Sequence, residues 1–316
     1  MLERLAGNTA LKSELGAALR AGRLPHAILL VGEPGCGAGF AARCLAADYL
    51  YPQGGPHAEA VLKKEDTECL VLQGEGASGQ IAVKRVREMR EAIQRSALST
   101  DAAGRVLFIY GAQNLNGSSA NAMLKIIEEP PEGVLFVLTA TSAATVLPTI
   151  RSRCAAYTIA PVPTDECAAL LTREGLPVRL AQELAFLYEG HIGTALQAFR
   201  NDTFKAALGL AKELCSYAAQ NDTYRTLVLV TKYERDRESF LALLWQLDQL
   251  CSAVLRRPAY GAEQCGGLLY RAGERQLHHR MEAGCGICIY DRWCAAAARL
   301  LHQCRHDAAG LRVVAF

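Results

Sequence analysis

No apolar run in this 316-residue sequence approaches the roughly 18 residues that a helix needs to cross a bilayer. The first five residues, Met1 to Leu5, lack the apolar core of a secretory leader and are expected to start a helix. There is also little excess charge, since 34 Lys and Arg face 32 Asp and Glu, a net charge of +2. The sequence therefore predicts a cytoplasmic protein with no membrane segment, and it lacks the broad positive field of a stand-alone nucleic-acid binder.

Repeated C-x-x-C pairs, the usual signature of a structural zinc site, are missing although the chain has twelve cysteines. Most of these cysteines stand inside apolar helical patterns, and in a reducing compartment we expect small core residues rather than disulfides. One cluster near the C-terminus has partly metal-like spacing, and it consists of Cys285, Cys288, Cys294 and Cys304. Buried thiols are the favoured interpretation and no metal is expected. A zinc-dependent nucleic-acid module built on these four residues stays open as an alternative.

Strand and helix signals alternate over the first 160 residues. Apolar runs bounded by turn residues predict strands at 27–31, about 69–72, 105–110 and 134–140. Amphipathic or small-residue stretches before and between them predict helices at 11–21, 39–51, 80–97 and 118–129. Alternation of this kind predicts an α/β domain at residues 1–160, with a parallel sheet covered by helices on both faces.

No convincing strand signal follows Pro161 to Pro163, and the rest of the chain has helical periodicity. Short helices up to about residue 205 predict a small helical domain at 161–205. Longer amphipathic helices, for example at 240–255, predict an all-helical domain at 206–316. The predicted fold class is therefore an α/β domain followed by a small helical domain and a larger one.

A glycine-rich loop joins the first predicted strand to the helix that follows it. Gly32 and Gly37 have the G-x-x-x-x-G spacing of a phosphate-binding loop, with a further glycine, Gly35, between them. The next two positions should be a Lys, which reaches the β- and γ-phosphates, and a Ser or Thr, which holds Mg²⁺. They are Ala38 and Gly39 in this chain. The loop is therefore degenerate.

A second loss lies at the end of the strand predicted at 105–110. A working P-loop needs an acid at the tip of a neighbouring strand to complete the metal site. This chain continues Tyr110-Gly111-Ala112-Gln113 and has no Asp or Glu until Glu128. Two losses in separate motifs predict that the chain uses no nucleotide cofactor and does not hydrolyse ATP. An active ATPase with an unorthodox loop is the alternative, and nucleotide-dependent turnover by the isolated chain would distinguish it.

The stretch from Ser118 to Cys154 carries motifs that occur together in a known family. A helix with A-N-A-x-L-K-x-x-E-E-P-P is followed by a strand and then by L-P-T-I-x-S-R-C, and G-R-L-P-H-A-I-L-L-V-G precedes the glycine loop. In these motifs the chain resembles the bacterial clamp-loader AAA+ proteins, over about residues 5–160. The resemblance implies an AAA+ P-loop domain, with 161–205 as its lid and 206–316 as the collar through which loader subunits assemble.

Among clamp-loader subunits, a dismantled loop with a retained S-R-C motif is similar to the delta-prime type, the stator of the DNA polymerase III loader. The lid agrees, since Gly193 stands where the motor subunits carry an arginine in G-x-x-R-x-A-L. The resemblance implies that Arg153, held by Ser152 and Cys154, is an arginine finger acting in trans on ATP bound by a neighbour. It also implies the motor subunits and delta as partners, with primed DNA contacted through the complex. Contact with the sliding clamp stays open.

Other interpretations and weaker features accompany this hypothesis. For Arg153 the alternative is a surface ion pair with a nearby acid, which stabilises a protein little. Arg151 is a second basic candidate but lies outside the motif position. The helix from Lys84 to Arg95 is a DNA candidate, although a solvated face with i,i+4 ion pairs is the favoured interpretation. The four-cysteine zinc module usual in the family has lost its ligands, because only His57 and Cys69 remain after the loop helix.

Overall fold

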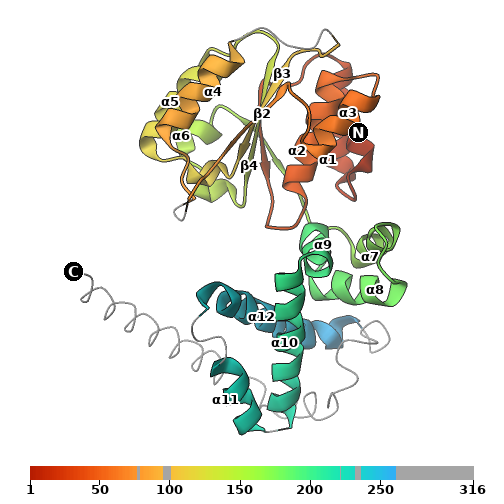
Figure 1. Ribbon diagram of the computed structural model, residues 1–316. Coiled ribbons are helices and arrows are strands. Elements are labelled where there is room, and N and C mark those ends of the chain that lie inside the picture. Colours follow the sequence, from red (N-terminus) through yellow and green to blue (C-terminus); the bar gives the residue numbers. More distant parts are fainter. Residues whose placement is uncertain (77–78, 95–100, 221, 232–235, 261–316) are drawn as a thin grey trace, which may run out of the picture. The chain divides into compact units, whose positions relative to one another are not determined.

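The computed structural model describes residues 1–76, 79–94, 101–220, 222–231 and 236–260 (Figure 1). These residues form two compact units. The first consists of Met1–Glu174 together with Glu189–Ala195, and the second of Gly175–Tyr188 together with the described residues from Leu196 onward. The chain therefore leaves the first unit, returns to it briefly and leaves it again. The division into 1–160, 161–205 and 206–316 stays a prediction.

The first unit is built on one parallel sheet of five strands in the spatial order β2-β3-β4-β1-β5. The strands are β1 (Ala27–Val31), β2 (Cys69–Gln73), β3 (Arg105–Tyr110), β4 (Val134–Ala140) and β5 (Ala155–Thr158). β1 lies between β4 and β5, with Val31 beside Ala140 and Ile28 beside Ala155. The chain leaves β1 toward one side of the sheet and leaves β4 toward the other. In such a sheet a ligand is expected outside the carboxyl ends of these two strands.

Alternate residues of the strands point to opposite faces, and each face is covered by its own helices (Figure 1). On one face Ile28 and Leu30 pack with the buried residues of α1 (Thr9–Arg20), α2 (Ala38–Leu50) and α3 (Pro56–Lys63). On the other face Ala27 and Leu29 pack with α4 (Val83–Ile93), α5 (Gly117–Glu128) and α6 (Pro148–Arg151). Because both faces are buried, the central strands are continuous apolar runs. The predicted class, a parallel sheet covered on both faces, is confirmed.

Several short elements of the first unit were not indicated by the sequence patterns. β1, β3 and β4 have the predicted bounds, and α1, α2 and α5 begin within two residues of prediction. β5 was not predicted, because its four residues alternate between half-buried and exposed and form no apolar run. The helices α3 and α6 were missed as well. The helix predicted at 80–97 begins later, at Val83. Single 3-10 turns lie at η1 (Leu2–Arg4), η2 (Ala112–Asn114) and η3 (Ala143–Thr145).

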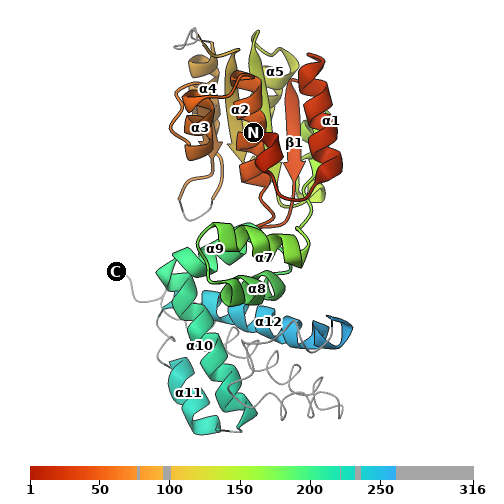
Figure 2. The same cartoon turned by 90° about the vertical axis from the view of Figure 1, so that its right-hand side faces the viewer.

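Beyond β5 all regular elements among the described residues are helices. The helices are α7 (Thr164–Arg173) in the first unit, then α8 (Val178–Leu187), α9 (Ile192–Arg200), α10 (Asp202–Ala219), α11 (Thr223–Thr231) and α12 (Arg237–Tyr260). In the second unit α10 packs against α11 and α12 (Figure 2). The buried Tyr188 donates its hydroxyl to Gln246 Oε1 at 2.9 Å and stacks on Trp245. None of the helices described here has the length and apolar character of a transmembrane segment.

Candidate functional site

The glycine loop lies where the sheet topology favours a ligand, between the carboxyl end of β1 and the start of α2. Gly32 continues from β1, since its N–H donates to Ala140 O at 3.0 Å. Gly37 is the N-cap of α2 and has a φ of +97°, a left-handed conformation that favours glycine. The first turn of α2 then begins at Ala38. The backbone therefore keeps the strand–loop–helix form of a phosphate-binding loop.

The beginning of α9 and the residues before it contact this loop directly. Gly193 N–H donates to Gly35 O at 2.9 Å, and His191 Nε2 lies 3.1 Å from Glu33 Oε2. A Cβ placed on Gly35 would stand 2.0 Å from Thr194 Oγ1, so glycine is required there. A Cβ on Gly193 would stand 3.1 Å from Gly35 O, which leaves little space for a side chain at this position. The loop is thus a packed turn whose outer residues already have protein partners.

The side chains nearest Gly39 are unsuited to holding a metal. A Cβ placed on Gly39 would stand 3.6 Å from the Tyr110 ring and 3.8 Å from Arg43 Nη1. Mg²⁺ prefers carboxylate, phosphate and water oxygens, whereas Arg43 is a permanent cation. Burial raises the pKa of Tyr110 above its ordinary value, so its phenol stays protonated near neutral pH. The position that carries the magnesium ligand in a working loop therefore has a cation and a neutral phenol beside it.

Arg153 lies at the other end of the sheet from the glycine loop. It follows the single turn of α6, which is anchored by the fully buried Ile150, and precedes β5. Because Ala155 stands beside Ile28, Arg153 is at the amino edge of the sheet, whereas Gly32 follows the carboxyl end of β1. Four residues of strand separate Ile28 from Gly32, which is about 13 Å. The arginine is therefore remote from the loop of its own chain.

Three hydrogen bonds hold the Arg153 guanidinium. Nε donates to Glu128 Oε1 at 2.6 Å, and Nη1 donates to Thr149 O at 3.1 Å and to Ser152 Oγ at 3.4 Å. The Arg153 side chain is still 41% exposed, and that of Glu128 is 45% exposed. Cys154 packs against the buried cluster under α5 and α6, and burial raises its pKa to about 11. Arg153 is thus ordered by its own chain and remains accessible to a partner.

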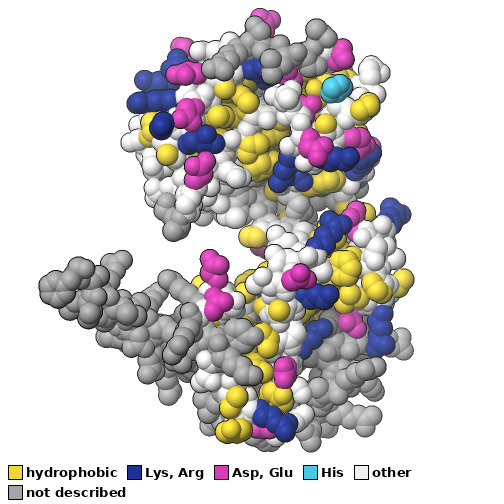
Figure 3. Space-filling view, viewed as in Figure 1, with side chains coloured by type: hydrophobic (Ala, Val, Ile, Leu, Met, Phe, Trp, Pro, Cys, Tyr) yellow, Lys and Arg dark blue, Asp and Glu magenta, His cyan; other side chains and the backbone are white. Residues whose placement is uncertain are grey.

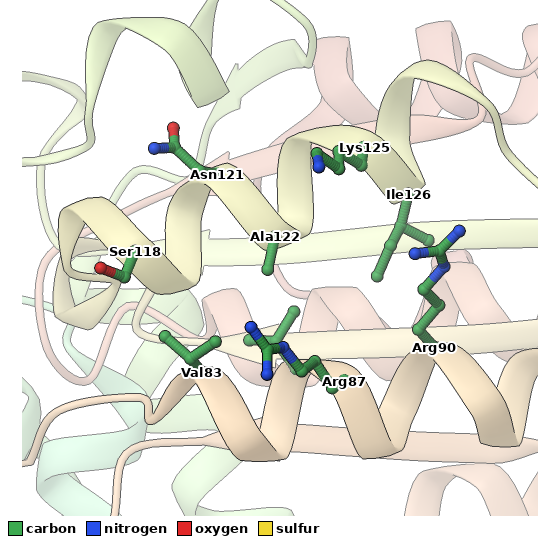
Figure 4. Close-up of a pocket in the computed structure, with 9 residues that line it drawn as sticks. Val83, Arg87, Arg90, Ser118, Asn121, Ala122, Lys125 and Ile126 are labelled. Atoms are coloured by element: carbon green, nitrogen blue, oxygen red, sulfur yellow. The ribbon is translucent and has the colours of Figure 1, made fainter.

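A solvent-open groove between α4 and α5 gathers further basic side chains (Figure 4). Its volume is about 270 Å³, and it is lined by Val83, Val86, Arg87, Arg90, Ser118, Asn121, Ala122, Lys125 and Ile126. Figure 4 shows Arg87 and Arg90 extending from α4 toward α5. The lining therefore includes three cations and no carboxylate.

The helix α4 was expected to have a solvated face with i,i+4 ion pairs, and the structure bears this out only in part. Lys84 Nζ lies 4.0 Å from Glu88 Oε1, which is such a pair. Within the part of the chain that the structure describes, Arg87, Arg90 and Lys125 make no ion pair. Figure 3 shows basic side chains gathered over the α4 and α5 side of the first unit, with acidic ones among them. The groove is thus a local concentration of unneutralised positive charge.

Comparison with known proteins gives the family. Residues 7–163 match the family model described as "DNA polymerase III, delta subunit". Over 263 residues the chain is 30% identical to "DNA polymerase III subunit delta'" of Escherichia coli (strain K12), which covers 79% of this chain and 75% of that protein. The chain belongs to the delta-prime family of DNA polymerase III clamp-loader subunits.

This delta-prime family chain is similar to other loader proteins over part of its length. It is 33% identical to "DNA polymerase III subunit gamma/tau" of Mycobacterium tuberculosis (strain ATCC 25618 / H37Rv) over 177 residues. That match covers 54% of this chain and 30% of the longer protein. A solved "dna polymerase iii, gamma subunit-related protein" of Thermotoga maritima aligns with a TM-score of 0.40 and 17% identity, covering 84% of this chain and 96% of that one.

Some residues that shape these sites in the delta-prime family chain had no separate signal in the sequence. Glu128 stands in the E-E-P-P motif, but its contact with Arg153 depends on α5 ending at the amino edge of the sheet. Thr194 and Arg43 approach the glycine loop only because α9 and α2 begin beside it. Arg151, the second basic candidate, donates from Nη1 to Ala143 O at 3.2 Å, within its own loop.

His57 and Cys69, the two residues that remain where the family usually has a zinc module, were expected to hold no metal. His57 stacks on Tyr51 with ring centroids 5.4 Å apart, and Cys69 is the first residue of β2. Over the described ranges there is no group of three or more His, Cys, Asp or Glu side chains arranged to hold a metal. The four C-terminal cysteines at 285, 288, 294 and 304 lie outside the described residues.

Proposed function

We propose that this chain is a non-hydrolysing, stator-like subunit of a clamp loader and that it supplies Arg153 in trans to the ATP site of a neighbouring subunit. The supporting observation is that the glycine loop and the exposed arginine stand at opposite ends of β1. A finger must reach the γ-phosphate, where it stabilises the charge that develops during phosphoryl transfer. About 13 Å of strand separates Gly32 from the level of Ala155, and Arg153 lies two residues before Ala155, so a nucleotide on another chain is the accessible target.

The condition of the loop supports the absence of hydrolysis. Ala38 offers no ammonium group to the phosphates, and Gly39 offers no hydroxyl to Mg²⁺. The chain after β3 has no acid to complete a metal site, and Arg43 adds a positive charge nearby. Thr194 fills the space beside Gly35. An active ATPase would need other residues to supply the missing ammonium, hydroxyl and carboxylate groups.

In such a loader the partners are motor subunits with an intact G-x-x-x-x-G-K-[ST] loop, together with delta. The helices from residue 206 onward would act as the collar through which the subunits assemble. Tyr224 and Val228, which stand one turn apart on α11, are 78% and 40% exposed and offer apolar surface for this purpose. Primed DNA would be met as part of the complex, and this chain would need no cofactor of its own.

The experiment that tests the proposal compares two arginine substitutions in a reconstituted loader. Arg153→Ala should lower the ATPase rate while the complex still assembles at full yield in size-exclusion chromatography. A trans finger contributes about 10³-fold or more at its own site, but the other sites of the ring continue to work, so the total rate falls modestly. Arg151→Ala is the matched control, because it removes an exposed arginine two residues away. Equal rates for wild type and Arg153→Ala, or equal losses for both variants, would contradict the proposal.

We also propose that the groove between α4 and α5 contacts phosphates of the DNA held by the loader. Three cations without carboxylate partners line it, which favours an anion. Such contacts are independent of sequence and depend on salt. Changing Arg87 and Lys125 together to alanine should lower the slope of log K against log salt for primed-DNA binding by about 1–2. Lys84→Ala, on the exposed and ion-paired side of α4, should leave the slope unchanged, and a slope equally insensitive to both changes would refute the contact.

A further inference from the structure

We infer that Glu128 is a positioning residue for Arg153, an inference that rests on the proposed function. Glu128 Oε1 accepts a charge-assisted hydrogen bond from Arg153 Nε at 2.6 Å. Thr149 O and Ser152 Oγ accept from Nη1. Within the described residues Nη2 has no acceptor. Its two hydrogens are therefore the ones presented to phosphate oxygens of a nucleotide bound by the neighbouring subunit.

Stability does not account for a carboxylate at position 128. Exposed ion pairs contribute little to folding, and both side chains here are more than two-fifths exposed. Glu128 is also the last residue of α5, where the negative end of the helix dipole disfavours a carboxylate. A neutral or basic residue would suit the helix better at this position. The contact is explained instead by its effect on Arg153, whose long side chain would otherwise sample many rotamers.

The support that carries Glu128 is well fixed. Asn116 and Ser119 form a reciprocal capping box at the start of α5, which closes the far end of the helix. Ile126 and Ile127, immediately before Glu128, are buried against the sheet. A catalytic group gains from being held in place by a rigid element before the substrate arrives, because small displacements cost large factors in rate.

The atom of Arg153 that Glu128 binds shows whether Glu128 would support the arginine or compete with a phosphate for it. If Glu128 bound the outer Nη groups, it would compete with a phosphate, and its removal would raise the rate of the neighbouring site. The bond to Nε leaves Nη2 available and fixes the plane of the guanidinium. Removal of Glu128 is therefore expected to slow the neighbouring site.

The test uses the reconstituted loader with the full chain carrying Glu128→Ala, Glu128→Gln, Arg153→Ala or both alanine substitutions, and Glu129→Ala as the matched control. Glu128→Ala should lower kcat for ATP hydrolysis by about half or more of the loss caused by Arg153→Ala, with KM for ATP changed less than about twofold. Glu128→Gln keeps an acceptor without its charge and should be intermediate. Glu129→Ala should match wild type. In the Arg153→Ala background, Glu128→Ala should have no further effect, because the two residues act as a unit.

The outcomes separate this inference from the proposed function. If Arg153→Ala lowers the rate but Glu128→Ala does not, or raises it, Glu128 does not position the arginine and the trans finger still stands. The same conclusion follows if the loss from Glu128→Ala persists undiminished in the Arg153→Ala background, since a structural effect would be additive. If Arg153→Ala itself has no effect on the rate, the proposed function and the role of Glu128 fall together.

Discussion

Gly35, Gly37 and Gly39 stand close together, but the structure requires glycine only at Gly35 and Gly37, and for different reasons. Gly35 has a φ of +90°, and a Cβ there would also collide with Thr194. Gly37 has a φ of +97°, but no atom lies within 4 Å of an added Cβ. Gly39 is in α2, with only ordinary contacts around an added Cβ. Alanine substitution at the three positions therefore separates two costs in stability, the cost of packing against the start of α9 and the cost of backbone strain.

Alanine at these positions should affect stability in a defined order. Gly35→Ala should be the most destabilising, by about 2–4 kcal/mol, because it combines left-handed strain with overpacking against Thr194. Gly37→Ala should cost about 1–2 kcal/mol from strain alone. Gly39→Ala should be neutral or stabilising by up to about 1 kcal/mol, because alanine favours a helix. Urea unfolding followed by circular dichroism measures the three. Equal costs at Gly35 and Gly37 would mean that Thr194 does not pack on the loop.

At the scale of elements, the sequence predicts those helices and strands whose pattern of apolar residues lies within the segment itself. β3 and β4 are buried on both faces, so their apolar runs reveal them and their bounds. β5 depends on its pairing with β1, and a four-residue edge strand leaves no pattern in the sequence. The residues of the candidate site divide in the same way into those that the sequence predicts and those that it does not. The lost loop residues and Arg153 are visible in motifs, whereas the approach of Thr194 to Gly35 and of Glu128 to Arg153 joins residues distant along the chain.

The loop as an element should not regain hydrolysis when only its own residues are restored. Ala38→Lys with Gly39→Thr supplies the phosphate and metal groups, and an added side chain at Gly39 meets only ordinary contacts. The acid after β3 is still absent, and Arg43 still stands beside the restored hydroxyl. Phosphate release by the isolated chain should therefore stay at background, for the wild type and for the double variant.

Binding of labelled ATP in the presence of magnesium is measured together with phosphate release for the wild type and the double variant. The wild-type chain should not bind ATP tightly. A micromolar Kd with measurable turnover by the wild type would support the active ATPase instead. Substantial turnover by the double variant alone would show that an acid elsewhere in the chain completes the metal site.

At the scale of the whole molecule, we propose that the two ends of the sheet serve different functions. In a ring of similar subunits, the carboxyl edge of one sheet would hold its own nucleotide and the amino edge would serve the nucleotide of a neighbour. At the first edge this chain has Ala38 and Gly39 where a working loop has Lys and Ser or Thr. It keeps an ordered, exposed Arg153 at the second. One ATP site would then be missing from the ring while its neighbour keeps its finger.

Clamp loading onto primed DNA is the measurement that tests the trans role of Arg153 most directly, because loading needs the ATP sites to act together. A loader that contains Arg153→Ala should load clamps more slowly than its modest loss of total ATPase would predict. Arg153→Lys should remain impaired, since it keeps the charge but loses the planar guanidinium that can be held at Nε and Nη1 while Nη2 faces the phosphate. Wild-type loading and ATPase rates for Arg153→Ala in a fully assembled complex would contradict the account.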